Sequence, residues 1–423
     1  MIKYLKYNKY MGTKMKKNNI FNKRLILIMA FVLLAGLFIS GCSNNQAELS
    51  ELSDADRASL VDGDNSDKGQ GALNREIIFQ IGAIQPLTGD GAAYGLPVQR
   101  VIDQAVLDLN AKWKEDGKKL QLKIYHEDGK CNGKEARTAA ENLVNQKGVN
   151  IIYGGMCSGE TLGIAPFTEE NNVLLFSPLS SSPDITNSGD YVFRNYPSDT
   201  AQVATMIPFI VSKGVKTIAI LSENTDYAQV LRAGYLKQLP ELGVKIVADE
   251  IILSSAKDVR TEILKMKSAE PDAVILLPQT IPMTGVFAKQ LYESNFDADT
   301  LFFSNEIVGL DQAVNEFGDF MKGYFTPEVA FLKENNEFSS KVIADTECDL
   351  GYYCASTYDG IFLLGDVLEL CGDSDTDCLK KEFDALENWQ GIMTTSTTFD
   401  ENGDVAGDFV ISQIIAGTKL RVN

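Results

Sequence analysis

The segment IIYGGMCSGE, residues 151–160, places two nucleophile-type side chains where an apolar strand gives way to a helix. Cys157 and Ser158 follow paired glycines, as a hydrolase nucleophile on a sharp turn does. A reactive thiolate needs a base or a cationic neighbour, and no basic residue lies close to Cys157 in the sequence. Either nucleophile would have to use His126, the only histidine. We therefore expect Cys157 to form a disulfide and His126 to be structural or solvated.

The other cysteines agree with this expectation. Six cysteines follow Cys42, and an even number outside the cytoplasm suggests three disulfides, although six cysteines permit fifteen connectivities. Local spacing favours two short loops, which leaves the first two of the six to pair with each other. Zinc is the alternative, but the chain has no Cys-x-x-Cys, so we expect no metal. The expected bridges are Cys131–Cys157, Cys348–Cys354 and Cys371–Cys378.

The glycine-rich segment GDGAAYG, residues 89–95, lies between the first expected strand and the first expected helix. Its glycine spacing is one residue too long for the dinucleotide fingerprint G-x-G-x-x-G, and no distinctive acid for a ribose follows. We expect a loop at the mouth of a cleft and no cofactor.

Two serines stand at the ends of neighbouring strands, where a ligand could be bound. Ser158 is expected at a helix N-cap, and the segment SPLSSSP (177–183) offers Ser182 as an N-cap before Pro183. A hydroxyl beside unpaired backbone N–H groups suits a carboxylate. The carboxyl ends of neighbouring parallel strands face one crevice, where ligands bind. These serines therefore support two interpretations equally, binding of a ligand and simple capping of a helix. Glu306, after an apolar strand, would be solvated or would bind an ammonium group.

The elements that would position these residues alternate between strand and helix. The expected strands are near-continuous apolar runs, which is typical of parallel sheets covered on both faces. Two such series predict an α/β protein with two doubly wound, Rossmann-like lobes. The strands are expected at 76–87, 120–128, 149–155, 173–178, 217–223, 244–252, 272–278 and 300–306. The helices are expected at 96–110, 133–147, 158–171, 199–213, 228–242, 259–268, 283–293, 333–346 and 355–370, followed by a hairpin with a polar turn at 395–415.

The amino-terminal residues read as a targeting segment. Residues 3–24 are basic without an acid, and residues 25–40 are an unbroken apolar run that ends directly before Cys42. The junction ISGC resembles a bacterial-type lipoprotein signal, so we expect cleavage before Cys42 and lipidation of its thiol. An uncleaved anchor helix is the alternative, and Met11 and Met15 are alternative starts.

The segment 42–75 is polar, acidic and free of aromatic residues, and we expect it to be a flexible tether. The whole chain has a formal net charge of −19, and residues 1–41 hold eight basic residues and no acid. The part that remains after cleavage is therefore more acidic still. Such a surface argues against a nucleic-acid partner and against close binding to anionic lipid headgroups.

Four connected blocks carry a resemblance to a known family. They are IGAIQPLTGDGAAYG, HEDGKCNGKEARTAAENLV, GVNIIYGGMCSGE and VLLFSPLSSSPDIT, and they are followed later by ENTDYAQ, FFSNEIVG and STYDGIFLL. In this order and spacing, nearly all of residues 76–423 resembles the branched-chain amino-acid-binding proteins of ABC importers, which have the type I periplasmic-binding-protein fold. The resemblance implies two lobes joined by hinge crossovers, formed by residues 76–197 plus 329–405 and by residues 198–328 plus 406–423.

The resemblance also implies roles for individual residues. Ser158 would bind the ligand α-carboxylate with its backbone N–H, Glu306 would receive the α-ammonium from the other lobe, and Cys131 would bridge Cys157. The segment from Leu179 to Ser181 would offer a carbonyl and a hydroxyl to the head group, with Ser181 helping to hold the carboxylate. The full set of expected ligand-binding residues is Tyr94, Ser158, Leu179, Ser180, Ser181, Tyr227, Thr280 and Glu306.

The chain departs from the family pattern in two places. Gln279 and Thr280 stand where the family often has an aromatic residue after a strand, which permits a more polar ligand. The segment 348–378 carries two expected bridges that the importer proteins need not have.

These features predict a lipid-anchored, extracytoplasmic solute-binding protein and no enzyme. It would be a monomer that captures an amino acid, branched-chain or related, and delivers it to an ABC permease. The alternatives are an amino-acid or amide receptor of the same fold without a transport role, and a hydrolase that uses Ser158 or Cys157 with His126.

Overall fold

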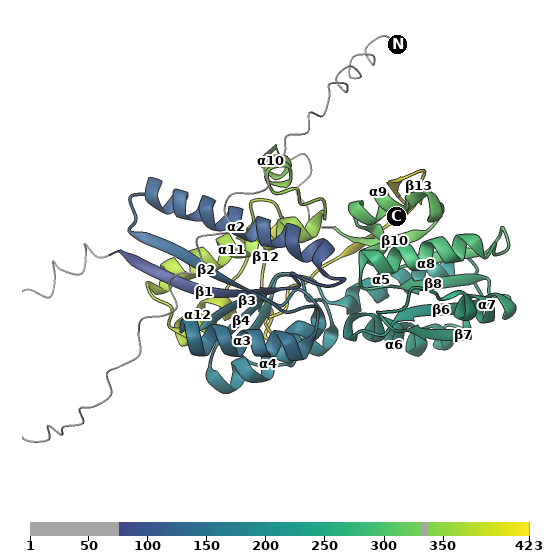
Figure 1. Cartoon of the computed structure of the whole chain (residues 1–423), viewed down its shortest axis with the longest axis horizontal. Coiled ribbons are helices and arrows are strands. Elements are labelled where there is room, and N and C mark those ends of the chain that lie inside the picture. Colours follow the sequence, from purple (N-terminus) through teal and green to yellow (C-terminus); the bar gives the residue numbers. More distant parts are fainter. Residues whose placement is uncertain (1–75, 331–336, 423) are drawn as a thin grey trace, which may run out of the picture. The chain divides into compact units, whose positions relative to one another are not determined.

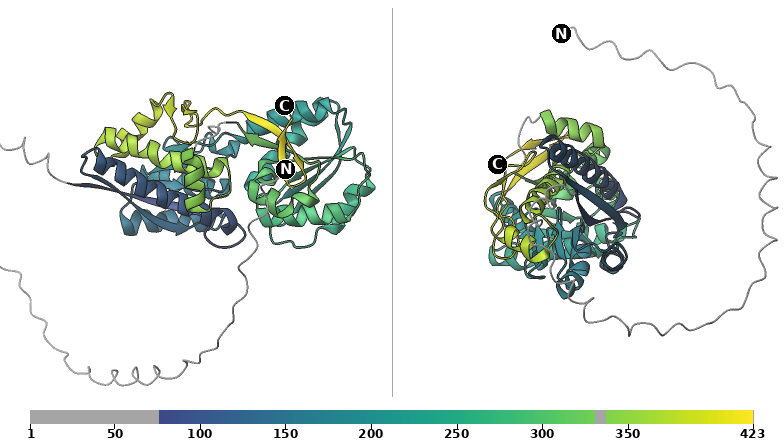
Figure 2. Two further views of the ribbon diagram at one scale, coloured as in Figure 1. Left: turned by 90° about the horizontal axis from the view of Figure 1, so that it is seen from above. Right: turned by 90° about the vertical axis from the view of Figure 1, so that its left-hand side faces the viewer.

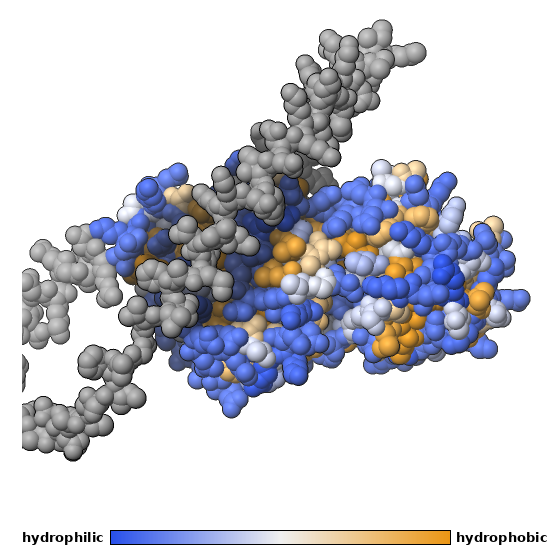
Figure 3. All heavy atoms as spheres, in the orientation of Figure 1, coloured by the Kyte–Doolittle hydropathy of each residue, from blue (hydrophilic) through white to orange (hydrophobic). Residues whose placement is uncertain are grey.

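The computed structural model describes residues 76–330 and 337–422 of the chain (Figure 1). The expected signal segment, the lipidation site at Cys42 and the expected tether lie outside the described residues. Within the described part, no helix combines the length and the apolar character needed to span a membrane. Polar residues cover most of the face shown in Figure 3.

The first sheet contains five parallel strands in the order β2-β1-β3-β4-β5. The order reverses direction between β1 and β3, which is the position where doubly wound sheets bind ligands outside the carboxyl ends of their strands. β3 and β4 are buried along their whole length, as expected from their apolar sequences. The strands are β1 (Ile77–Gln85), β2 (Leu120–Asp128), β3 (Ile151–Gly154), β4 (Leu174–Ser177) and β5 (Val192–Arg194).

Helices cover both faces of this sheet. α2 packs against α11 and α3 packs against α4, and Figure 1 shows the two pairs on opposite sides of the strands. α3 illustrates how the sequence determines a helix, because the Asn132 side chain accepts from the backbone N–H of Lys134 and Gly148 ends the helix in a left-handed conformation. The helices are α2 (Ala92–Glu115), α3 (Gly133–Lys147), α4 (Ser158–Asn171), α10 (Glu337–Thr346), α11 (Tyr352–Cys371) and α12 (Thr376–Asp384).

The second sheet contains seven strands in the order β14-β13-β10-β9-β8-β6-β7. Its first five strands along the chain are parallel, and β13 and β14 join antiparallel at one edge (Figure 2). α5 packs against α6, while α8 packs against α7 and α9. The strands are β6 (Thr217–Glu223), β7 (Lys245–Ile252), β8 (Ala273–Leu277), β9 (Leu301–Ser304), β10 (Phe325–Val329), β13 (Phe409–Ile415) and β14 (Thr418–Arg421). The helices are α5 (Asp199–Ser212), α6 (Asp226–Glu241), α7 (Arg260–Ser268), α8 (Ile281–Glu293) and α9 (Asp311–Phe317).

The chain passes between the two sheets three times: after β5, after β10 and before β13. The expected hairpin over 395–415 is confirmed at its polar turn, where Phe399 and Val405 form an antiparallel bridge, but its outer parts pair with other strands. Its first part, β12 (Ser396–Thr397), pairs with β11 (Trp389–Gln390), and its last part, β13, pairs with β10 and β14. Strand β13 therefore completes the second sheet through a partner about eighty residues earlier in the chain, whereas the sequence pattern favours its neighbour.

A buried ion pair fastens this late segment to the first sheet. Arg194, at the end of β5, has a fully buried side chain and donates from Nε and Nη2 to the two carboxylate oxygens of Asp404, at 2.6 and 2.7 Å. Its Nη1 also donates to the carbonyl oxygen of Ser182, at 2.7 Å. The guanidinium therefore joins the carboxyl-terminal segment to the loop after β4, which carries the expected head-group residues.

The structure contains the three expected disulfides, Cys131–Cys157, Cys348–Cys354 and Cys371–Cys378. The first links the loop after β2 to the turn before α4. The other two lie at the two ends of α11.

Candidate binding site

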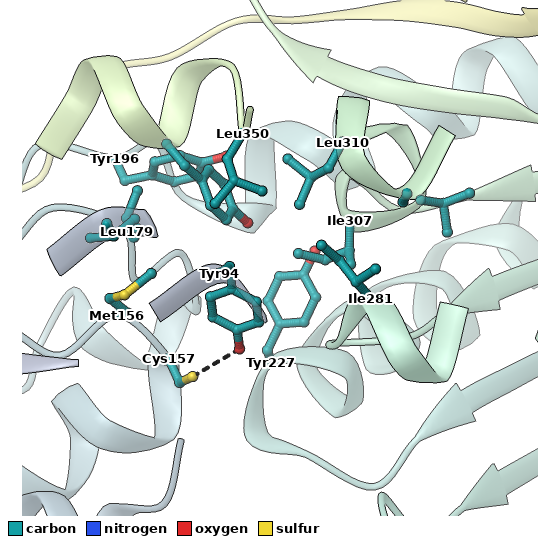
Figure 4. Close-up of a cluster of buried hydrophobic side chains, with 14 of the residues drawn as sticks. Tyr94, Met156, Cys157, Leu179, Tyr196, Tyr227, Ile281, Ile307, Leu310 and Leu350 are labelled. Carbon is teal, nitrogen blue, oxygen red and sulfur yellow. Dashed lines mark hydrogen bonds between the residues drawn. The ribbon is translucent and has the colours of Figure 1, made fainter. Parts of the chain in front are cut away.

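A small cavity of about 20 Å³, enough for about one water molecule, lies where the carboxyl ends of the two sheets face each other. Figure 4 shows Met156 and Leu179 on one side of Tyr94 and Tyr227, with Ile307 on the other side. An apolar pocket with a few polar groups, placed at the ends of parallel strands, is typical of a small-molecule site. It is lined by Tyr94, Met156, Cys157, Ser158, Leu179, Ser181, Tyr227, Gln279, Ile307 and Tyr353.

Ser158 is the first residue of α4, and the N-cap is Cys157, one residue earlier than expected. The helix has the expected bounds, but the hydroxyl of Ser158 does not cap it. The Ser158 Oγ instead accepts from the backbone N–H of Ser182, at 3.1 Å, so its own hydrogen remains for another acceptor. Because Ser158 stands in the first turn, its backbone N–H is one of those that a helix leaves without an internal acceptor.

Glu160 holds this turn in place and was not singled out from the sequence. Its side chain is fully buried. Oε2 accepts from the backbone N–H groups of Met156 and Cys157, at 3.0 and 3.1 Å, and Oε1 accepts from that of Cys131, at 2.8 Å. Burial raises the pKa of the Glu160 carboxyl to about 7, while these hydrogen bonds lower it. The sequence signal is a capping box, an N-cap residue followed three positions later by Glu.

The first disulfide forms part of the cavity wall. The Tyr94 hydroxyl lies 3.1 Å from both Cys131 Sγ and Cys157 Sγ, and Figure 4 marks the second contact. Cys157 is thus a bonded structural residue. The ring nitrogens of His126 contact Gln85 Nε2 and Asp103 Oδ1, at 2.6 and 2.9 Å. The hydrogen-bond partners of His126 among the described residues are therefore Gln85 and Asp103, and neither is a nucleophile candidate.

The glycine-rich loop is held by an acid of the next strand. Asp128 Oδ1 accepts from the backbone N–H groups of Leu87 and Thr88, at 2.8 and 3.3 Å, and Oδ2 accepts from the Thr88 hydroxyl, at 2.5 Å. These bonds fix the entry to the loop at the end of β1, which leads into the first turn of α2, where Tyr94 lies.

The two serines after β4 have opposite surroundings. Ser180 is buried against the fold, where its Oγ lies 2.7 Å from Thr161 Oγ1 and donates to the carbonyl oxygens of Gly155 and Met156, at 3.0 and 3.2 Å. It is not among the residues that line the cavity. Ser181 lines the cavity, and its Oγ donates to Asp199 Oδ2, at 3.0 Å.

Glu306 lines a second cavity and is not among the residues that line the first one. Its side chain is 5% exposed, and its oxygens accept from the Tyr196 and Tyr353 hydroxyls, at 2.5 and 3.4 Å. It lines the second cavity together with Tyr196, Leu310 and Tyr353, and Tyr353 lines both. Burial raises the pKa of the Glu306 carboxyl to about 7, although the two hydroxyls lower it.

A second buried acid, Asp199, lies close to Glu306 and was not expected from the sequence. Burial and the nearby Glu306 carboxylate raise the pKa of Asp199 well above its usual value, against the lowering effect of Ser181 and Arg194. Gln202 links the two acids, because its Nε2 donates to Asp199 Oδ1, at 2.9 Å, and its Oε1 accepts from the Glu306 N–H, at 3.3 Å. No local pattern in the sequence points to this pair, which comes together only in three dimensions.

The other expected residues divide between the cavity and its surroundings. Tyr227 lines the cavity, as expected, and Gln279 lines it as well, with its Nε2 3.5 Å from Cys131 Sγ. Thr280 caps α8, where its Oγ1 accepts from the Met283 N–H, at 3.2 Å. It lines a neighbouring, more polar cavity that also includes Asp90.

The sequence profile of the periplasmic binding protein family matches residues 79–419. The chain belongs to this family. The expected family and its α/β, two-sheet type I fold are therefore confirmed, and the family implies an extracytoplasmic location.

This periplasmic binding protein is similar to the leucine-, isoleucine-, valine-, threonine- and alanine-binding protein of Pseudomonas aeruginosa, with 26% identity over 79% of this chain and 89% of the relative. Its fold is similar to that of the branched-chain amino-acid transporter substrate-binding protein of Streptococcus pneumoniae in complex with isoleucine. The TM-score is 0.70, the identity is 21%, and the match covers 82% of this chain and 100% of the other.

The same fold also occurs with a different kind of ligand. A solute-binding protein of an ABC transporter from R. palustris, in complex with 4-hydroxybenzoate, matches with a TM-score of 0.72 and 17% identity, over 82% of this chain and 96% of the other. The fold alone therefore does not show whether the ligand is an amino acid or an aromatic acid. The ligand class has to be inferred from the polar groups of the cavity.

Proposed function

We propose that this periplasmic binding protein captures an α-amino acid, branched-chain or related, in the cavity between its two sheets and delivers it to an ABC importer. The observation that carries the proposal is the polarity of the site. The start of α4 with Ser158 offers hydrogen-bond donors in the first cavity, and the buried carboxyl of Glu306 offers acceptors in the second cavity, which shares Tyr353 with the first. A zwitterion matches both sides.

The carboxylate of the ligand is assigned to Ser158, through the backbone N–H and the hydroxyl hydrogen that its contact with Ser182 leaves available. The ammonium is assigned to Glu306, whose carboxyl lines the adjoining cavity, so side chains between the two cavities have to move when the ligand binds. Charge-assisted hydrogen bonds of this kind contribute about 1.5–3 kcal/mol each.

The ligand side chain is assigned to the space among Tyr94, Met156, Tyr227 and Ile307. These are apolar or aromatic surfaces that suit an aliphatic chain. Gln279 adds an amide to this wall, so amino acids with a polar side chain belong to the candidates. Leu179 closes the same wall next to Ser181.

Delivery to a permease rests on the two-lobed architecture. We assign the lobes to residues 76–197 plus 329–405 and to residues 198–328 plus 406–423, since α10 and α11 pack on α2 while β13 and β14 extend the second sheet. The mechanism is hinge closure around the ligand by a monomer. A lipid on Cys42 would keep the protein at the membrane beside its permease. A receptor of the same fold, coupled to a signalling partner, is the second candidate.

Isothermal titration calorimetry on the full chain in detergent tests the ligand class, after a thermal-shift screen of amino acids, amides and aromatic acids that includes 4-hydroxybenzoate. We expect micromolar binding of at least one α-amino acid. Binding of 4-hydroxybenzoate with no binding of any amino acid would overturn the proposal. Loss of uptake of the same amino acid in cells that lack this chain separates transport from sensing.

A further inference from the structure

The hydroxyl of Ser181 is committed to a buried carboxylate. Ser181 Oγ donates to Asp199 Oδ2, at 3.0 Å, and the Asp199 backbone N–H donates to the Ser181 carbonyl oxygen, at 2.8 Å. Asp199 is 1% exposed, so this two-way contact is shielded from water. A hydroxyl has a single hydrogen. When Asp199 is ionised, its oxygens can only accept, so the Ser181 hydrogen points to Asp199 and the Ser181 oxygen remains to accept a hydrogen bond from a ligand.

The orientation of Asp199 is itself fixed. Its other carboxylate oxygen, Oδ1, accepts from Gln202 Nε2, at 2.9 Å, and the amide oxygen of Gln202 accepts from the backbone N–H of Glu306. Both ends of the Gln202 amide are therefore engaged, which prevents the amide from turning over. Asp199 is held between Ser181 and the residue proposed to bind the ammonium.

Ser158 and Ser181 thus present opposite groups to one cavity. The Ser158 oxygen accepts from the Ser182 N–H and keeps its hydrogen for an acceptor, whereas the Ser181 hydrogen is taken and its oxygen remains for a donor. No Lys, Arg or His is among the described residues that line the cavity. The nearby guanidinium of Arg194 is paired with Asp404. The surroundings of Ser181 therefore favour a cationic donor.

We propose that Asp199 is a positioning residue, which turns the Ser181 hydroxyl oxygen toward the ligand as an acceptor and so makes the site select ligands with an ammonium group over carboxylic acids without one. This inference rests on the proposed function and deepens it. A 2-hydroxy acid has the carboxylate and the side chain of the matching amino acid but no ammonium, so it reports directly on this selection.

The test measures the dissociation constants of L-leucine and of its 2-hydroxy analogue, 2-hydroxy-4-methylpentanoate, by calorimetry on the full chain. If another amino acid binds more tightly in the screen, it and its own 2-hydroxy analogue are the probes. In the Asp199→Asn variant, the amide N–H can donate to the Ser181 oxygen, so the hydroxyl hydrogen of Ser181 no longer points to residue 199 and can turn toward the ligand. We expect the affinity for the amino acid to fall about tenfold or more, and the preference over the hydroxy acid to fall by a similar factor.

Ser181→Ala and Ser181→Thr separate positioning from a merely structural effect. Ser181→Ala removes the acceptor oxygen and should lower amino-acid affinity, whereas Ser181→Thr keeps the oxygen and should retain affinity. In a chain that already carries Ser181→Ala, adding Asp199→Asn should lower the amino-acid affinity by less than about twofold. An equal loss of affinity for both probes in Asp199→Asn, or additive effects in the double variant, would overturn the inference while leaving the proposed function intact. Absence of amino-acid binding by the unaltered chain would overturn both.

Discussion

Gly159, at the start of α4, lies against Asp226, at the start of α6, so helices of the two sheets meet at the neighbouring polar cavity that both residues line. A Cβ on Gly159 would stand 2.6 Å from Asp226 Oδ2, and the three nearest atoms around that position all belong to Asp226. The starts of α4 and α6 therefore lie close together across the two sheets. A methyl group at Gly159 would meet only the exposed carboxyl of Asp226, which can move aside, whereas a branched side chain needs more room between the two helix starts.

We expect Gly159→Val to push the two helix starts apart and to weaken ligand binding by about 1 kcal/mol, the low end of the cost of overpacking, because the exposed Asp226 carboxyl can move aside. Calorimetry of the full chain measures the loss. The Asp226→Ala change opens the space that the valine needs, so the double variant should recover most of the affinity. Unchanged binding in Gly159→Val would mean that the bound state does not need this contact.

Glu306→Gln separates binding from folding at one residue. The amide keeps the size of the side chain but removes the charge that attracts an ammonium, and we expect amino-acid affinity to fall by about 3 kcal/mol or more. The melting temperature at about pH 8 should be unchanged or higher, because a buried carboxyl with a raised pKa destabilises the fold above that pKa. A lower melting temperature with full affinity would contradict the ammonium assignment.

The affinity for an amino acid should depend on pH through the same carboxyl. The pKa of Glu306 in the empty site is about 7. Above this value the carboxylate attracts the ammonium, and below it the proton competes with the ligand. We therefore expect affinity to fall by up to about tenfold per pH unit between about pH 7 and about pH 5, with proton release on binding. Calorimetry in buffers of different ionisation enthalpy measures both effects.

The neighbouring Asp199 titrates together with Glu306, and the hydroxyls of Tyr196 and Tyr353 face Glu306. Glu306→Gln is the control for this pH profile, because it removes the main titrating group without changing the other three. A profile that keeps its slope in Glu306→Gln would assign the dependence to another residue.

Helices and disulfides whose signals lie within a few residues of one another were predicted accurately from the sequence. The bounds of α4 were predicted residue for residue, because an apolar strand, paired glycines and a polar helix start follow one another within a few positions. The short spacing within the pairs Cys348–Cys354 and Cys371–Cys378 made those bridges predictable for the same reason.

What depends on distant contacts was not predictable in this way. Ser180 and Ser181 are adjacent and chemically identical, yet the first is bonded to carbonyl groups of the fold and the second faces the cavity. Only the path of the loop decides between them. Asp199 and Tyr353 reach the site from α5 and α11, and neither follows one of the strands whose ends were used to predict the site.

The buried ion pair between Arg194 and Asp404 should contribute strongly to stability. Asp404→Ala leaves a fully buried guanidinium without its carboxylate, and we expect the free energy of unfolding to fall by about 3–5 kcal/mol. Denaturant titration measures the loss. The exposed pair of Lys380 and Asp384 on α12 is the matched control, where Asp384→Ala should cost about 0.5 kcal/mol or less. Equal losses would show that the segment around Asp404 is held by other contacts.

The bridge between Cys131 and Cys157 should matter for binding as well as for stability, because Cys157 lines the cavity and Tyr94 rests against both sulfurs. Replacing both cysteines by alanine removes this support from the Tyr94 ring and from the turn before Ser158. We expect a loss of about 2–4 kcal/mol in unfolding free energy and weaker amino-acid binding. The matched control replaces Cys371 and Cys378, whose bridge lies outside the residues that line the cavity. That variant should lose stability and keep its affinity, so equal affinity losses in the two double variants would contradict a role for the first bridge in shaping the site.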